Sequence, residues 1–132
     1  MLTKEISYID YNGNKRTEKF YFNLTEAELV EMEYTTAGGM KEMLVKIIEA
    51  QDNPSLFKVF KDFILKSYGE KTLDGRGFIK VDKDGYRLVD GFMQTEAFSQ
   101  LMIELVSDAN KAAEFVNAVI PEARRHGLTS VQ

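Results

Sequence analysis

Apolar and polar residues alternate over much of residues 2–22, which is the period of a β-strand with one buried face. Residues 6–11 and 17–22 are also rich in aromatic and β-branched side chains, which favour strands. Between them lies Asn12-Gly13, which predicts a type I′ turn because both central residues of that turn take positive φ. The segment is therefore predicted to form a β-hairpin. Since an isolated hairpin is marginal in water, it must pack on the rest of the chain.

After residue 24 the apolar residues follow the period of an α-helix. The first helix is predicted to begin at Thr25, which forms a capping box with Glu28, and to extend to about Tyr34. A second helix is predicted to begin near Gly39, where apolar residues recur at the i, i+3, i+4, i+7 spacing of one helix face. That face consists of Met40, Met43, Leu44, Ile47 and Ile48.

Three further helices are predicted from capping signals and apolar spacing. One opens at Asn53-Pro54, with asparagine as N-cap and proline at the first helical position, and is expected to end with Gly69 as its C′ residue. The last two are capped by Thr95 and Asp108. Their predicted inner faces are Leu56, Phe57, Phe60, Phe63 and Ile64; Phe98, Leu101, Met102 and Leu105; and Ala112, Phe115, Val116 and Val119.

Residues 70–94 lack a helical period and contain the turn signals Asp74-Gly75 and Asp84-Gly85. Within them, residues 78–81 and 86–89 could pair as a second small hairpin. A connection of this length is unusual in a compact domain, so we expect either an insertion or a functional loop. Its many apolar residues would mark a protein interface if they are exposed, and would be structural if they fold back on the core.

Together these elements predict an α+β fold in which an N-terminal β-hairpin packs on a bundle of about five helices. The length of 132 residues and a composition of 44% hydrophobic and 29% charged residues suit one globular domain. We assign that domain to residues 1–121. Residues 122–132 are polar and aperiodic, and are expected to form a C-terminal tail.

The residue types needed for catalysis and cofactor binding are sparse. The chain has no cysteine, and His126 lies in the polar tail without a partner that could make it a general base. The loop around Gly85 does not fit a calcium site, because placing this glycine at position six puts Lys80 and Gly91 at the two ends, where oxygen ligands are needed. The Gly-Arg-Gly motif at 75–77 opens no predicted helix and lacks the rest of a phosphate loop. We therefore expect no enzyme activity, no cofactor and no metal.

The net charge of −4 is distributed unevenly. Residues 21–55 hold 2 basic and 7 acidic residues, whereas residues 56–90 hold 8 basic and 6 acidic ones. No segment is basic enough to follow a phosphate backbone, so a nucleic-acid partner is not expected. The acidic residues suit solvated helix faces, which could also attract a basic partner. With no apolar run near the roughly 18 residues of a membrane span and no signal-like N-terminus, we expect a cytoplasmic protein without a membrane partner.

Binding to another protein is then the expected activity, and two apolar regions are candidates for it. Methionine commonly fills gaps in cores, but methionine-rich grooves also accept varied helices. The apolar residues of the 70–94 region form the second candidate. The candidate protein-binding residues are Met40, Met43, Phe78, Ile79, Val81, Tyr86, Leu88, Val89 and Phe92.

Six stretches carry a resemblance to known proteins: Tyr11-Asn12-Gly13, residues 20–29, Gly38-Gly39 before a Lys/Glu/Ile-rich helix, residues 63–69, residues 94–98, and the Ala-rich helix that ends at Ile120-Pro121. Their order is similar to that in tail assembly chaperones, which are encoded in the tail gene clusters of phages and prophages of Gram-positive bacteria. The similarity spans residues 5–121 and rests on this order, because none of the stretches carries chemistry of its own.

This resemblance implies a protein that binds the long, helix-rich tape measure protein of a long-tailed phage, keeps it soluble and helps tail tube subunits polymerise around it. It implies action in the host cytoplasm and absence from the mature virion. It also implies a longer form, made by a programmed ribosomal frameshift, that would diverge in the tail after Pro121. The alternative is a structural virion protein, such as a tail tube, neck or tail-completion component, with larger and more apolar interfaces. A homo-oligomer is left open.

Overall fold

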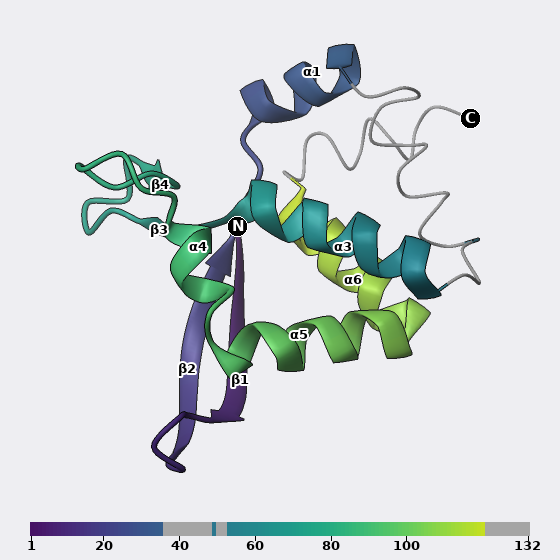
Figure 1. Ribbon diagram of the computed structural model, residues 1–132. Coiled ribbons are helices and arrows are strands. Elements are labelled where there is room, and N and C mark those ends of the chain that lie inside the picture. Colours follow the sequence, from purple (N-terminus) through teal and green to yellow (C-terminus); the bar gives the residue numbers. More distant parts are fainter. Residues whose placement is uncertain (36–48, 50–52, 121–132) are drawn as a thin grey trace.

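The computed structural model describes residues 1–35, 49 and 53–120 (Figure 1). The helix predicted to begin near Gly39, with Met40 and Met43, lies outside the described residues. The predicted tail at residues 122–132 also lies outside them.

A four-stranded antiparallel sheet with the order β1-β2-β3-β4 contains the predicted hairpin. In β1 and β2 the register pairs Leu2 with Phe22 and Ile9 with Lys15, so the hairpin is fully paired over eight residues of each strand. Two residues of β2, Tyr21 and Phe22, pair with β3. The strands are β1 (Leu2–Ile9), β2 (Lys15–Phe22), β3 (Tyr68–Lys71) and β4 (Phe78–Ile79).

The tip of the hairpin is not the predicted type I′ turn. Gly13 has a φ of 81°, whereas Asn12 is not among the residues with positive φ. The Asp10 carboxylate accepts hydrogen bonds from the backbone N–H groups of Asn12 and Asn14, both at 2.9 Å. These bonds fix a longer loop with one left-handed glycine, because an aspartate side chain can stand in for a backbone acceptor in a turn.

Five helices lie within the described residues, and the α+β fold class is confirmed. The predicted capping box is present: Thr25 N–H donates to Glu28 Oε1 at 2.9 Å, and Glu28 N–H donates to Thr25 Oγ1 at 3.1 Å. Asp108 caps the last helix as predicted, since its side chain accepts from the N–H groups of residues 110 and 111. The helices are α1 (Glu26–Thr35), α3 (Asn53–Ser67), α4 (Leu88–Phe92), α5 (Glu96–Ser107) and α6 (Ala109–Val119).

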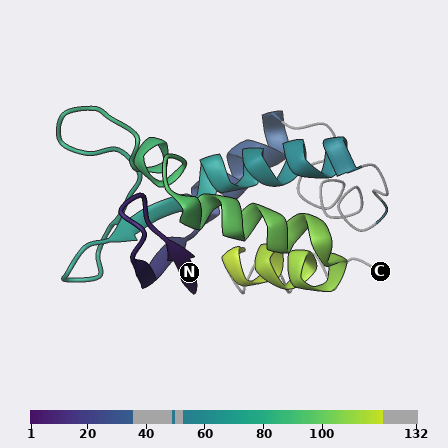
Figure 2. The same ribbon diagram turned by 60° about the horizontal axis from the view of Figure 1, so that its bottom comes forward.

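The core lies where α3, α5 and α6 pack against one another and against the hairpin. α5 contacts both α3 and α6, and it also packs on β1 (Figures 1 and 2). Phe22 of β2, Phe63 of α3 and Phe115 of α6 meet in this core, with the Phe115 ring centroid 5.1 Å from that of Phe22 and 5.9 Å from that of Phe63. The predicted inner face of α6 is fully buried. These contacts supply the packing that the hairpin needs in order to be stable.

Two expectations for residues 68–92 differ from the structure. Gly69 does not end a helix in the left-handed conformation; instead Tyr68 begins β3 directly after α3. A Cβ atom at Gly69 would lie 2.5 Å from the backbone oxygen of Ile79, so the close approach of β4 requires glycine. Residues 86–89 do not continue as a strand, because Val89 and Phe92 both face the core and one helical turn, α4, places them there.

A small second hairpin is nevertheless present in the 70–94 region. It consists of β3 paired with β4, extended by a single antiparallel bridge between Val81 and Arg87. The predicted turns at 74–75 and 84–85 are confirmed, since both Gly75 and Gly85 have positive φ, at 75° and 89°.

Candidate functional site

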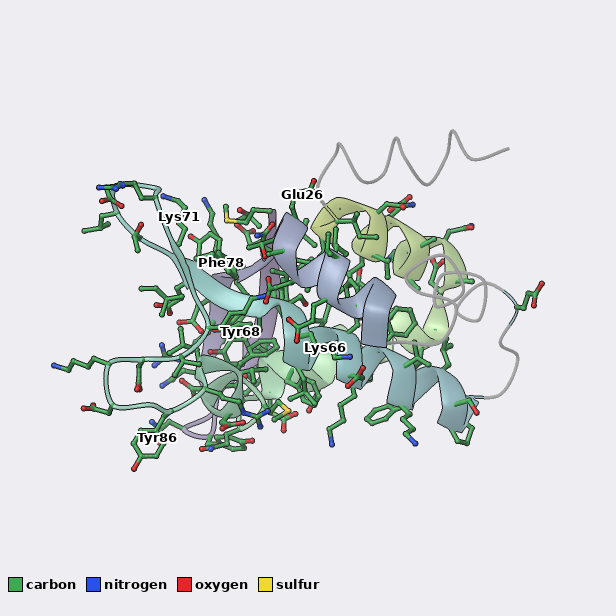
Figure 3. All side chains as sticks on the ribbon, turned by 90° about the horizontal axis from the view of Figure 1, so that it is seen from above. Glu26, Lys66, Tyr68, Lys71, Phe78 and Tyr86 are labelled. Carbon is green, nitrogen blue, oxygen red and sulfur yellow. The ribbon has the colours of Figure 1, made fainter. Side chains whose placement is uncertain are left out.

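The predicted binding residues of the 70–94 region separate into two groups. Val89 and Phe92 are buried in the core. Val81 and Tyr86, by contrast, are 53% and 72% exposed, and Figure 3 shows Tyr86 pointing away from the helices. The other described candidates are Phe78 and Ile79, which are half-buried and exposed respectively, and Leu88, which retains an exposed surface.

Lys80 holds this region against two helices. Its Nζ lies 2.7 and 2.6 Å from the two carboxylate oxygens of Glu28 at the start of α1. The same ammonium donates to the backbone oxygen of Lys66 in the last turn of α3 at 2.7 Å. A cation is favourable there, because the last carbonyl groups of a helix carry partial negative charge. These contacts of Lys80 thus hold in place the exposed apolar residues on either side of it.

Phe92 is the centre of an aromatic cluster beneath the same region. Its ring stacks on that of Tyr68 with centroids 4.5 Å apart and an interplanar angle of 9°. Phe20 lies 5.0 Å away and Phe98 5.9 Å away. Burial, with smaller contributions from nearby carboxylates, raises the pKa of Tyr68 to about 12. This cluster explains why Phe92 serves the core and not an exposed surface.

An apolar groove that the sequence did not predict lies between α3 and α5. It has a volume of about 270 Å³ and is lined by Phe57, Phe98, Ser99, Met102, Ile103 and Val106. Phe57 is 42% exposed and Ile103 is 58% exposed. Such a groove between two helices is the geometry that accepts the apolar face of a third helix.

The sequence does contain a signal for this groove. Helical spacing assigns Phe57 to the inner face of its helix, although the buried residues Leu56, Phe60 and Phe63 already complete that face. Ile103 lies outside the predicted inner stripe of α5 altogether. A large apolar residue on an outer helix face, next to another on the adjacent helix, indicates a contact surface.

Exposed charged residues of both signs follow Phe57 on α3. Lys61 is exposed one helical turn after Phe57, and it lines a separate hollow together with Lys58 and Asp62. On another face, a hollow of about 210 Å³ is lined by Leu24, Glu28, Glu31, Met32 and Lys66. The lining of the α3–α5 groove itself contains no charged residue and suits the apolar face of a helix.

Within residues 1–35, 49 and 53–120, no group of three or more His, Cys, Asp or Glu residues is arranged to hold a metal ion. In the same part of the chain, no helix has the length and apolar character needed to cross a membrane.

A family model described as phage tail assembly chaperone matches residues 1–126 of the 132-residue chain. The chain belongs to the phage tail assembly chaperone family. No curated protein and no solved structure matches it significantly. The family implies that this tail assembly chaperone interacts with phage tail proteins and has a non-enzymatic role. The exposed apolar groove is the kind of surface such an interaction needs.

Proposed function

We propose that this tail assembly chaperone binds and solubilises the tape measure protein and assists tail tube assembly. It acts in the host cytoplasm and is absent from the mature virion. The observation that carries the proposal is the apolar groove between α3 and α5 in a member of this family. The chaperone covers amphipathic helical segments of its partner there, so that these segments do not associate with one another before assembly.

Phe57 and Ile103 are the main anchors of the proposed contact. Each retains an exposed apolar surface, and full burial of such a side chain contributes about 1.5–3 kcal/mol relative to exposure. Two partial burials of this kind, set against the cost of ordering a bound segment, give a modest affinity. Modest affinity suits a chaperone, because its partner must later be transferred to the growing tail.

The proposed partner segment is a helix with apolar residues at i, i+3 or i+4, and i+7. Lys61, one helical turn after Phe57, favours an acidic residue at that end of the apolar stripe. A second proposed contact is made by Ile79, Val81 and Tyr86. Their side chains are exposed, and the bond from Lys80 to Glu28 holds this segment in place. Met40, Met43, Phe78 and Leu88 remain proposed contributors to partner binding, whereas Val89 and Phe92 are buried in the core and do not face a partner.

The test is co-expression of the chaperone with the tape measure protein of the same phage, with affinity capture and measurement of the soluble fraction. We expect the wild-type chaperone to co-purify with the tape measure protein and to raise its solubility. Phe57→Glu should abolish both effects, because it places a charge in the groove. Tyr86→Glu places a charge in the second proposed contact instead and should weaken capture only in part. Leu73→Glu, which charges a fully exposed apolar residue outside both contacts, is the matched control and should leave capture unchanged.

If Phe57→Glu captures the tape measure protein as well as the wild type does, the groove is not the binding site. Loss of capture in Tyr86→Glu alone would move the site to the 78–92 region. If the tape measure protein stays insoluble and nothing co-purifies, the proposed function is wrong. Detection of the chain in purified particles by mass spectrometry would then favour a structural virion protein.

A further inference from the structure

The outer edge of β1 is the long free edge of the described sheet. β1 is the first strand in the order β1-β2-β3-β4 and spans eight residues, whereas β4 at the opposite end spans only two. In Figure 1 β1 lies on the α5 side of β2. A strand at a sheet edge presents backbone N–H and C=O groups that can pair with another strand.

The hydrogen bonds at the hairpin tip determine which residues face this edge. Asp10 N–H donates to the backbone oxygen of Asn14 at 2.9 Å, so the backbone of Asp10 faces the second strand. In an antiparallel pair, successive residues direct these groups alternately towards and away from the partner strand. The outward residues of β1 are therefore Thr3, Glu5, Ser7 and Ile9.

A polar groove runs along this edge. Four consecutive residues, 4–7, line a hollow of about 340 Å³ together with Gln100, Ile103 and Glu104 of α5. Consecutive residues of a strand have side chains on opposite faces, so a hollow that touches all four lies along the edge and not on one face. A second hollow of about 310 Å³ continues past Leu2 towards α6.

We infer that this groove binds an extended segment of a partner tail protein, which adds to the sheet as a further strand beside β1. The segment pairs with the outward N–H and C=O groups of β1, and alternate side chains point towards the outer face of α5. This mode of recognition, in which a strand is added at a sheet edge, obtains its affinity from main-chain hydrogen bonds and its specificity from alternate side chains. The inference rests on the proposed function for the nature of the partner.

The charges along β1 indicate the chemistry of that segment. Glu104 is shared by two lysines that line the hollow: its Oε2 lies 3.0 Å from Lys4 Nζ and its Oε1 lies 3.7 Å from Lys111 Nζ. Glu5 is exposed and has Lys19 opposite it in β2, but it forms no ion pair with Lys19 or with another described residue. A basic residue opposite Glu5 and an apolar residue against Ile103 therefore complete the site.

Two of the registers in which a second copy of the chain could pair with this edge are unfavourable. In a two-fold antiparallel pairing of β1 centred on Lys4 or Glu5, the central residue lies opposite itself. Like charges directly opposite each other destabilise a sheet. A segment from another protein avoids this repulsion.

Proline substitutions at two paired positions test the inference. Ser7 and Thr17 are cross-strand partners, and their hydroxyl oxygens lie 2.9 Å apart. Ser7→Pro removes an N–H from the groove edge, whereas Thr17→Pro removes one from the opposite side of the hairpin, beyond the residues of β2 that pair with β3. Proline is tolerated where the strand N–H does not pair within the sheet, and both variants lose the same hydroxyl contact.

The probe is an array of overlapping 15-residue peptides that cover the tape measure and tail tube proteins of the same phage. The full chain of each variant is applied to the array, and circular dichroism verifies that both variants are folded. We expect peptides that bind the wild type and Thr17→Pro equally, and bind Ser7→Pro about tenfold more weakly. Amide exchange at Glu5 and Ser7 should slow when such a peptide binds.

Three outcomes would overturn the inference: no peptide binds, bound peptides bind Ser7→Pro equally well, or sedimentation shows a dimer that Ser7→Pro dissociates. The last result would assign the edge to a second copy. If full-length tape measure protein is still captured and Phe57→Glu still abolishes its capture, the proposed function stands while the edge inference fails.

Discussion

Lys80 offers the most direct test of how the 70–94 region is held in place. Its ammonium group contacts both carboxylate oxygens of Glu28 and the backbone oxygen of Lys66. Lys80→Met retains most of the aliphatic chain and removes only the charge and its hydrogen bonds. The variant therefore isolates the polar contacts from the packing of the side chain.

The expected loss of stability depends on the exposure of the groups. The side chains of Lys80 and Glu28 are 22% and 34% exposed, so solvent screens the pair only in part. An exposed ion pair contributes about 0–1 kcal/mol, and a hydrogen bond to a charged group about 1.5–3 kcal/mol. We expect Lys80→Met to lower the free energy of unfolding by about 2 kcal/mol, measured by urea denaturation.

A double-mutant cycle with Glu28→Gln identifies the partner. Glutamine can still accept from Thr25 N–H, so the capping box survives while the charge is lost. We expect a coupling energy of about 1 kcal/mol between positions 28 and 80. Lys83→Met, an exposed lysine of the same region, is the control and should cost less than about 0.5 kcal/mol. The reasoning is wrong if Lys80→Met costs no more than this control, or if the coupling energy is zero.

Three other variants test the sheet, the aromatic cluster and a helix cap. Gly69→Ala should cost about 2 kcal/mol in urea denaturation because its Cβ would meet the backbone of β4, whereas Gly91→Ala, with open space around it, should cost nothing. Tyr68 has a pKa of about 12 in the folded chain and of about 10 in the unfolded chain. Its contribution to the free energy of unfolding should therefore be constant below pH 10. Between pH 10 and 12 that free energy should fall by about 1 kcal/mol, a figure that allows for the partial exposure of the side chain. Tyr68→Phe should remove that alkaline loss, and its persistence would implicate another group. Asp108→Ala should lower the melting temperature through the loss of about 1 kcal/mol of capping energy, and an unchanged value would contradict the capping role.

Features encoded by neighbouring residues could be predicted from the sequence. The capping box at Thr25, the cap at Asp108 and the buried stripe of α6 each depend on spacings within about two helical turns. These signals survive in the fold because tertiary packing agrees with them. The hairpin itself has the same local basis, although the side chain of Asp10 alters its tip.

Features that depend on segments far apart in the chain could not be predicted. The strand β3 exists because Gly69 pairs with Tyr21 and passes close to β4, and neither contact has a local signature. The candidate binding surface has the same limitation. Exposure of Phe57 and Ile103 depends on how α3 and α5 cross, which no periodicity within either helix specifies.

The direct junction of α3 and β3 has a consequence for how the proposed partner would be released. Ser67 ends the helix and Tyr68 begins the strand, so this wall of the groove continues into the sheet without a hinge. The other wall, α5, packs on β1 and is joined to it by the Lys4–Glu104 ion pair. A groove fixed to one sheet on both sides cannot open like a clamp. Under the proposed function, we therefore expect a bound segment to leave by competition, when growing tail subunits bind the same segment more tightly.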